Sequence, residues 1–264
     1  MRKKCISSLF FFILVLPLFG QADSTATNID TTTFVYGNVM YEKGKYEKSI
    51  AIYENLLAQN GPSATLYYNL GNCYYKTDKL GLSVLNYERA LFYDGRKEDI
   101  KYNLELVNLR IRDKMDPINQ SLVTIWSHNF IKIFSVHSWA FFCILFLWTA
   151  LSGFAIYRYA KKRNFQRYGF FGFVISLVIF VLTLVSVFAR NNYDKNYQFA
   201  IVMSPSSIVK SEPNESSTNM FLIHEGLKVQ VLESDNNWTE VKMPDGNVGW
   251  LKNEDIVAVG DMIL

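Results

Sequence analysis

The chain has 264 residues, of which 50% are hydrophobic and 16% aromatic, and its formal net charge is +3. No basic face interleaved with aromatic residues accompanies that charge, so the composition excludes a dedicated nucleic-acid-binding protein. Three cysteines are too few for the disulfide framework of a small secreted domain. The high hydrophobic content indicates a multidomain membrane protein with soluble parts.

Residues 1–22 have the features of an export signal. The first four residues hold three cations, residues 9–16 form an apolar stretch, and the small Ala22 suits a cleavage site after it. The alternative is an uncleaved anchor, which would leave the same topology. Residues 23–33 are rich in Ser, Thr, Asn and Asp, and this composition is typical of a linker.

The region 34–116 repeats with a period of 34 residues. Gly37 and Tyr53 of the first copy are followed one period later by Gly71 and Tyr87. This period is typical of helix-turn-helix repeats that stack into an all-α solenoid. We expect the small Gly71 to let two helices approach, and Tyr87 to fill the space between one repeat and the next.

The second copy resembles the tetratricopeptide repeat. The residues that match are Tyr67, Leu70, Gly71, Tyr74, Tyr87, Ala90 and Leu91. The first copy departs from the pattern at Met40, Ser49 and Leu56. Residues 98–115 are a partial third copy, which we expect to be a capping helix. The resemblance implies a concave groove that binds an extended peptide or the surface of another protein.

In its best-known form, the groove of this family grips a C-terminal carboxylate through two asparagines and three basic residues. Asn38 and Asn69 match the asparagines, but Phe34, Asp99 and Asn103 occupy the basic positions, so a free carboxylate is a poor candidate ligand. The candidate partner-binding residues are Asn38, Tyr41, Tyr68, Asn69, Asn72 and Tyr75. The alternative is that the tyrosines only pack across adjacent helices.

Two uncharged apolar segments lie at residues 137–157 and 168–189. Each has the length of a helix that crosses the hydrocarbon core, about 20 residues. Residues 158–167 between them hold five cations and no acid, which predicts a cytoplasmic turn with both flanks on the opposite side. The cations are Arg158, Lys161, Lys162, Arg163 and Arg167.

Residues 117–136 connect the repeats to the first apolar segment. Within them, Ser121–Ser135 carries apolar residues at helical spacing, which indicates an amphipathic helix on the membrane surface. The competing interpretation is an ordinary helix packed on the repeats. His128 and His137 are too isolated for a metal site, and His224 has no nearby Cys or His.

The last segment, residues 190–264, changes to short runs of alternating or continuous apolar residues, which predicts strands. Asp245-Gly246 is a hairpin-turn signal. The pattern over Ala200–Val259 resembles the bacterial Src-homology-3-like domain, a small all-β barrel. The residues that match are Gly226, Trp238, Gly246, Gly249 and Trp250.

That family often binds cell-wall peptides or protein partners. The resemblance therefore makes Trp238 and Trp250 candidate partner- or wall-binding residues. The alternative is that both tryptophans serve the core of the barrel and its rim.

Catalytic motifs are missing from the sequence. It has no Gly-x-Ser-x-Gly, no His-Glu-x-x-His, no glycine-rich phosphate loop and no paired Cys ligands. The apolar segments also lack charged groups at depth, which a transporter normally requires. We therefore expect no enzyme, no metal site and no cofactor.

The order of signal, repeats, basic-turned hairpin and Src-homology-3-like domain resembles the BatE family of the Bacteroidetes aerotolerance (Bat) operon. The resemblance implies an inner-membrane component that acts beside other Bat-family membrane proteins. We expect a non-enzymatic scaffold or adaptor with both soluble domains in the periplasm. The alternative is an envelope sensor that binds peptidoglycan through its C-terminal domain.

Overall fold

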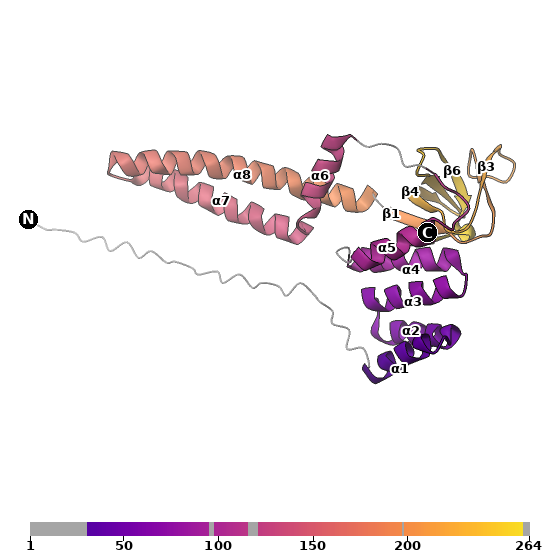
Figure 1. Ribbon diagram of the computed structural model, residues 1–264. Helices are drawn as coiled ribbons and strands as arrows, with labels where there is room; N and C mark the ends of the chain where they lie inside the picture. The colour runs from indigo at the N-terminus through magenta and orange to yellow at the C-terminus, as the bar shows by residue number, and fades with distance from the viewer. Residues whose placement is uncertain (1–30, 95–97, 116–120, 197, 261–264) are drawn as a thin grey trace, which may run out of the picture.

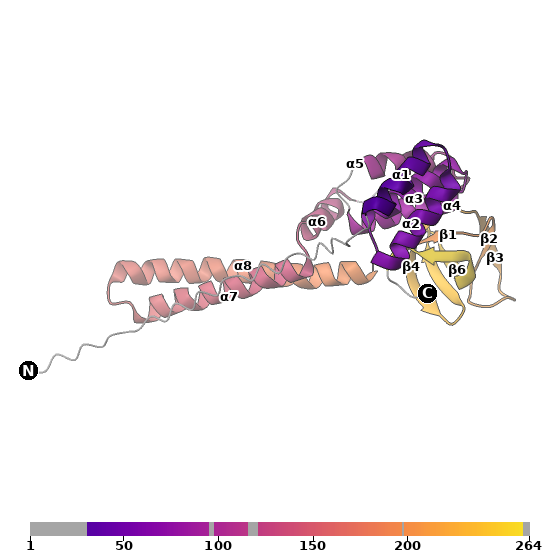
Figure 2. The same cartoon turned by 90° about the horizontal axis from the view of Figure 1, so that it is seen from below.

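The computed structural model describes residues 31–94, 98–115, 121–196 and 198–260. It consists of a helical array, a long helical hairpin and a separate antiparallel sheet (Figure 1). The expected export signal at residues 1–22 lies outside the described residues. Two views at right angles show the array and the sheet side by side at one end of the hairpin (Figures 1 and 2).

The first five helices form the repeat array. They are α1 Thr31–Glu42, α2 Tyr46–Asn60, α3 Ala64–Lys76, α4 Leu80–Tyr93 and α5 Glu98–Asn108. Helix α1 begins inside the expected linker. A Cβ atom at Gly71 would lie 2.6 Å from the ring of Tyr87, and one at Gly37 would lie 2.6 Å from the ring of Tyr53. The predicted close approach is therefore present in both copies, and both tyrosines are buried.

Helices α7 Val136–Tyr159 and α8 Arg163–Asn196 pack against each other as an antiparallel hairpin. Both are long and apolar enough to cross a membrane. The helices extend into the expected basic turn, which shortens to residues 160–162. A Cβ atom at Gly169 would lie 2.5 Å from the backbone nitrogen of Tyr157, so the glycine permits close contact of the two helices.

The sheet has seven strands in the order β3-β2-β6-β5-β4-β1-β7, and every pairing is antiparallel. The strands are β1 Gln198–Val202, β2 Ser207–Lys210, β3 Asn219–Ile223, β4 Lys228–Asp235, β5 Trp238–Lys242, β6 Val248–Lys252 and β7 Ile256–Ala258. The predicted hairpin turn lies between β5 and β6, where Gly246 has a φ of +92°. The runs of apolar residues did not predict β2 and β3, which flank the Ser-rich loop at residues 211–218.

The sheet is open, because its edge strands β3 and β7 do not pair with each other. It is nevertheless curled, because all seven strands contribute buried side chains to one core cluster. One such residue from each strand is Ala200, Val209, Ile223, Val229, Val241, Leu251 and Ile256. The expected barrel is thus a curled sheet that is not closed.

Candidate functional site: a groove in the repeat array

A groove with a volume of about 500 Å³ lies on the repeat array. It is lined by α1, α3 and α5, with one tyrosine from α2. The lining residues are Phe34, Asn38, Tyr41, Glu42, Tyr53, Thr65, Tyr68, Asn69, Asn72, Asp99 and Ile100. Five of the six residues predicted for a partner-binding face therefore come together here.

Tyr75, the sixth predicted residue, does not line the groove. The guanidinium of Arg110 lies 4.9 Å from the centre of its ring. Arg110 also forms an ion pair with Asp78, with 2.5 Å between Nη2 and Oδ1. The chain that follows α5 thus covers Tyr75, whereas Tyr41, its counterpart one period earlier, lines the groove.

A hydrogen-bonded network holds the polar floor of the groove in place. The hydroxyl of Tyr87 donates to Oδ1 of Asn72 at 2.6 Å. The amide nitrogen of Asn103 donates to the same oxygen at 3.0 Å and to the hydroxyl of Tyr68 at 3.1 Å. Asn103 thereby joins the network, although sequence comparison placed it at a clamp position.

The same network occurs 34 residues earlier in the chain. Tyr53 donates to Oδ1 of Asn38 at 2.6 Å, and the amide of Asn69 reaches that oxygen at 3.3 Å. Within the described residues, the side-chain nitrogens of Asn38 and Asn72 have no hydrogen-bond partner. Two oriented amide groups are therefore available to donate hydrogen bonds to carbonyl oxygens of an extended chain.

Tyr53 and Tyr87 donate their hydrogen bonds as neutral phenols. Burial raises the pKa of Tyr41 and raises that of Tyr53 to about 12. Burial also raises the pKa of Tyr87, the buried residue that donates to Asn72. A phenol with an ordinary pKa of about 10 is already protonated at neutral pH, and the raised pKa keeps Tyr53 and Tyr87 as donors at still higher pH.

A second cavity of about 470 Å³ lies on the sheet and includes Trp238. Lys252 projects into it, with its Nζ 2.6 Å from Oε1 of Glu215 and 5.9 Å from the centre of the Trp238 ring. The hydrogen bond from Lys252 lowers the pKa of Glu215, and the same bond raises the pKa of Lys252. The cavity combines an aromatic ring with charges of both signs.

Both candidate tryptophans face away from the core of the sheet. Thr239 and Val241 of β5 and Leu251 of β6 are fully buried. Trp238 and Trp250 stand at the alternate positions of these strands and are half-buried. The alternation therefore assigns the tryptophans to the outer surface, and Trp250 does not line the second cavity.

The array and the sheet share a buried contact, which we call the array–sheet junction. Strand β1 is buried on both faces: Ala200 and Val202 join the core of the sheet, whereas Ile201 joins the core of the array. The buried residues of the junction cluster are Val84, Leu85, Tyr87, Ala90, Ile100, Leu104, Val107, Ile201 and Val259. The sheet therefore packs on helix α4 through β1, and the expected capping helix α5 contributes residues to the same cluster.

Polar contacts surround the junction. Lys228 Nζ lies 2.6 Å from Oε2 of Glu88, and Nη2 of Arg89 donates to the carbonyl oxygen of Ala258 at 3.1 Å. Asp113 accepts from the backbone nitrogen of His224 at 2.5 Å and lies 2.9 Å from its Nδ1. Sequence reasoning missed this interface. The one sequence feature that could have indicated it is Glu88, a charged residue in a helix whose other residues are mostly apolar, since such a residue needs a partner when it is buried.

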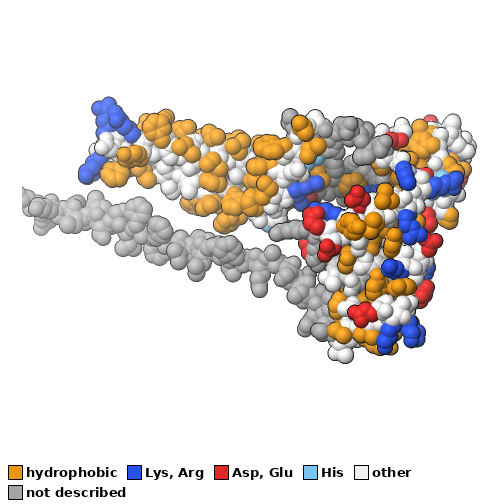
Figure 3. Space-filling model, in the orientation of Figure 1, with side chains coloured by type: hydrophobic (Ala, Val, Ile, Leu, Met, Phe, Trp, Pro, Cys, Tyr) orange, Lys and Arg blue, Asp and Glu red, His pale blue; other side chains and the backbone are white. Residues whose placement is uncertain are grey.

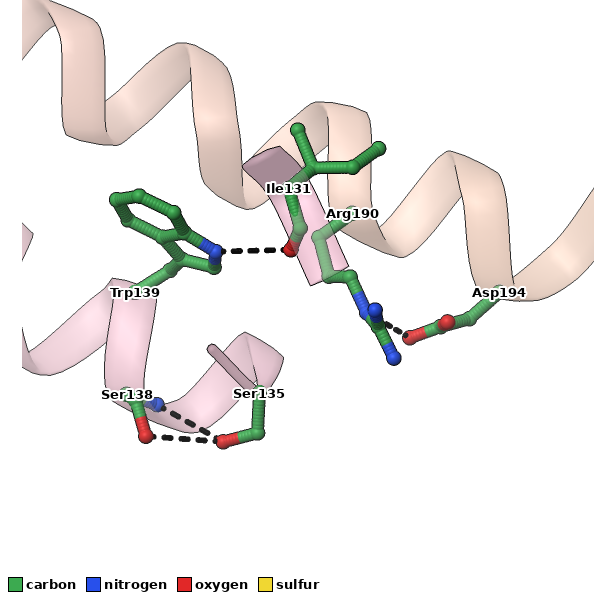
Figure 4. A network of polar contacts seen from close by, with 6 residues as sticks. All are labelled: Ile131, Ser135, Ser138, Trp139, Arg190 and Asp194. Atoms are coloured by element: carbon green, nitrogen blue, oxygen red, sulfur yellow. Dashed lines mark hydrogen bonds and ion pairs between the residues drawn. The ribbon is translucent and has the colours of Figure 1, made fainter. Parts of the chain in front are cut away.

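Helix α6, Leu122–Lys132, precedes the hairpin, and a hydrogen bond joins it to the start of α7 (Figure 4). The indole nitrogen of Trp139 donates to the carbonyl oxygen of Ile131 at 3.1 Å, and Ser135 caps α7. Arg190 and Asp194 form an ion pair of 3.0 Å on the neighbouring stretch of α8. The exposed apolar side chains of α6 are Leu122, Ile125, Trp126 and Phe130. This apolar surface is the feature expected of a helix at a membrane interface.

The far end of the hairpin is strongly basic. Hydrophobic side chains cover the body of the hairpin, and Lys and Arg side chains gather at its tip (Figure 3). The five predicted topology residues are at or beside this tip: Arg158 is in the last turn of α7, Lys161 and Lys162 lie in the turn, and Arg163 and Arg167 are in the first turns of α8. The basic tip is thus opposite the end that carries the array and the sheet.

No group of three or more His, Cys, Asp or Glu residues that could hold a metal ion occurs in the part of the chain that the structure describes. The family model for the TPR repeat, the tetratricopeptide repeat, matches residues 37–78. A comparison with curated proteins finds no match. The chain therefore contains a TPR repeat, a module that suggests protein–protein interaction, and two helices that could span a membrane.

Proposed function

We propose that this protein is a non-enzymatic membrane scaffold or adaptor whose repeat array and sheet bind protein partners. The observation that carries the proposal is the groove, which presents free amide donors between aromatic side chains. The match to the TPR repeat supports a protein ligand for it. The hairpin supports membrane attachment, because its two helices have the length and composition of membrane spans.

The proposed location is a bacterial inner membrane, with both soluble parts in the periplasm. The basic tip supports this orientation, since positive loops are retained in the cytoplasm. The test is thiol labelling of intact cells in a background without native cysteines. Ser216→Cys should react with an impermeant maleimide, whereas Lys161→Cys should react only after lysis. Labelling of the latter in intact cells would reverse the topology.

The proposed setting is a Bat-type membrane complex. Its support is the order of the modules, which resembles that of the BatE family. Crosslinking in native membranes, followed by identification of the attached proteins, tests this setting. Recovery of other Bat-family membrane proteins is expected, and a set of crosslinked partners without any of them would count against it.

Blocking the groove tests the scaffold function more cleanly than deleting the repeats, because deletion would expose the array–sheet junction. Thr65 is exposed and lines the groove. Thr65→Trp should therefore fill the groove while leaving its hydrogen bonds intact. Lys76→Trp on the same helix lies outside the groove and is the matched control. Loss of crosslinked partners in the Thr65 variant alone is expected; equal partner sets in both variants would disprove groove binding.

The second cavity supports an alternative function, an envelope sensor that binds peptidoglycan through the sheet. The strand order and the outward-facing tryptophans support a relation to bacterial Src-homology-3-like domains. Sedimentation of the detergent-solubilised chain with purified peptidoglycan tests this alternative. Co-sedimentation that Trp238→Ala abolishes would favour it, and a chain that stays in the supernatant would eliminate it.

A further inference from the structure

Among the described residues, the groove is lined by acidic side chains and by no basic ones. Its charged lining residues are Glu42 at the last position of α1 and Asp99 in the first turn of α5. Both are exposed, and neither forms an ion pair within the described residues. Among the described residues that line the groove, no cation neutralises these two carboxylates, so this part of the groove has a negative potential.

The two carboxylates differ in their local fields. Glu42 lies at the C-terminal end of its helix, where the helix dipole adds negative potential. Asp99 lies at an N-terminal end, where the dipole offsets part of its charge. The stronger attraction for a cation is consequently at Glu42, which lines the same groove as Tyr41.

In the second repeat, the tyrosine equivalent to Tyr41 is Tyr75, and a cation contacts its ring. There, Arg110 lies over the ring of Tyr75 at 4.9 Å and pairs with the carboxylate of Asp78 at 2.5 Å. Tyr41 is the counterpart of Tyr75 one period earlier. An aromatic face next to a carboxylate favours a guanidinium or ammonium group, because the ring and the carboxylate both attract positive charge.

In the first repeat the corresponding cation is missing from this position. Lys76 stands one period before Arg110, but within the described residues it makes no ion pair and no contact with an aromatic ring. Tyr41 instead lies edge-on to Tyr46, with 5.3 Å between the ring centres. No cation among the described residues therefore lies over the ring of Tyr41.

We propose that the groove binds an extended internal segment of a partner protein that carries a Lys or Arg side chain. The cation contacts the ring of Tyr41 and pairs with Glu42; Arg110 makes the same two kinds of contact with Tyr75 and Asp78, although the residue one period before Asp78 is Gly44. Asn38 and Asn72 donate to the carbonyl oxygens of the segment. This inference rests on the proposed function and specifies the chemistry of the ligand: the groove selects a positive side chain, and a free C-terminal carboxylate is repelled.

The test is an array of short, terminally blocked peptides with randomised positions, probed with the detergent-solubilised full chain. Blocked ends remove any contribution from a terminal charge. Bound peptides should be enriched in Lys and Arg. The affinity of a selected peptide should fall about two- to fivefold in Glu42→Gln, the range of one exposed ion pair. Asp99→Asn should have a smaller effect.

Two matched controls lie on α5 outside the groove. Glu105→Gln removes an exposed carboxylate, and Tyr102→Leu removes an exposed ring as a control for Tyr41→Leu. Neither control should change the binding of the selected peptide. Peptides bound without enrichment in cations, or an affinity unchanged in Glu42→Gln and Tyr41→Leu, would overturn the inference and leave groove binding intact. Retention of no peptide at all would overturn both the inference and the groove-binding part of the proposed function.

Discussion

The ammonium nitrogen of Lys228 lies 2.6 Å from a carboxylate oxygen of Glu88, and this ion pair joins strand β4 of the sheet to helix α4 of the array. The Glu88 side chain is 10% exposed, whereas that of Lys228 is 37% exposed. The carboxylate thus depends on its partner far more than the ammonium group does. We therefore expect the packing of the sheet on the repeat array to depend on the Lys228 side chain.

Replacing Lys228 with Met should destabilise the soluble region by about 1–3 kcal/mol, because it leaves a desolvated carboxylate without a partner. Glu88→Gln should cost less, since Lys228 can still reach solvent. Thermal unfolding of the solubilised chain, followed by circular dichroism, measures both effects. Lys242→Met removes a lysine of β5 that forms no ion pair within the described residues, and it is the control. Equal midpoints for Lys228→Met and Lys242→Met would show that the pair does not stabilise the junction.

Truncation at adjacent positions of β1 should loosen different parts of the molecule. Ile201 and Val202 are both fully buried, but Ile201 belongs to the array–sheet junction and Val202 to the core of the sheet. Ile201→Ala should cost about 2–5 kcal/mol and Val202→Ala somewhat less, because fewer buried carbons are lost. Hydrogen exchange should accelerate in α4 and α5 for the first variant and in β4 and β5 for the second. Identical exchange patterns would contradict a junction distinct from the sheet core.

Gly71→Ala should destabilise the array although alanine favours helices. The added Cβ would lie 2.6 Å from the ring of Tyr87, and such overpacking costs about 1–3 kcal/mol. Gly81→Ala in α4 is the control, because its Cβ would meet no atom closer than 3.5 Å. That variant should be neutral or gain about 0.5–1 kcal/mol from helix propensity. A thermal midpoint that rises in both variants would show that the Gly71–Tyr87 contact can relax freely.

Gly169→Leu should separate the two helices of the hairpin, because its Cβ would lie 2.5 Å from the backbone of α7. Gly172→Leu is the control on the same helix, since nothing lies within 4 Å of its Cβ position. The reporter is a disulfide between cysteines at Phe154 and Phe173, whose ring centres are 5.6 Å apart. Oxidation in membranes should form this bond in the control and not in Gly169→Leu. Equal yields would rule out close packing at this glycine.

Cys73 should resist thiol reagents until the array unfolds. The residue is fully buried, and burial raises the pKa of its thiol to about 11. At pH 8 about one thiol in a thousand is then ionised, and the thiolate is the reactive form. In a variant that retains only this cysteine, labelling should be slow in buffer and fast in denaturant. Rapid labelling of the folded chain would show that the site opens locally.

The periodic parts of this protein could be predicted from sequence. Gly71, Tyr87 and the 34-residue spacing determine the repeat helices, because they act between neighbouring turns and neighbouring helices. The two long apolar helices follow from the lengths of their uncharged segments. Five of the six candidate groove residues also follow from the period, since equivalent positions of a solenoid face the same side.

The tertiary structure alone decided which surfaces remain open. Lys228 and Glu88 are separated by 140 positions in the chain, and no sequence period relates a helix surface to a strand that packs on it. The same limit applies to Tyr75, which Arg110 covers although its counterpart Tyr41 faces the groove. Sequence patterns report which face of an element is apolar, whereas the partner of that face depends on how distant segments meet. For this protein, the sequence determined the modules, and the fold determined that the sheet packs on helix α4 of the array and leaves its groove free.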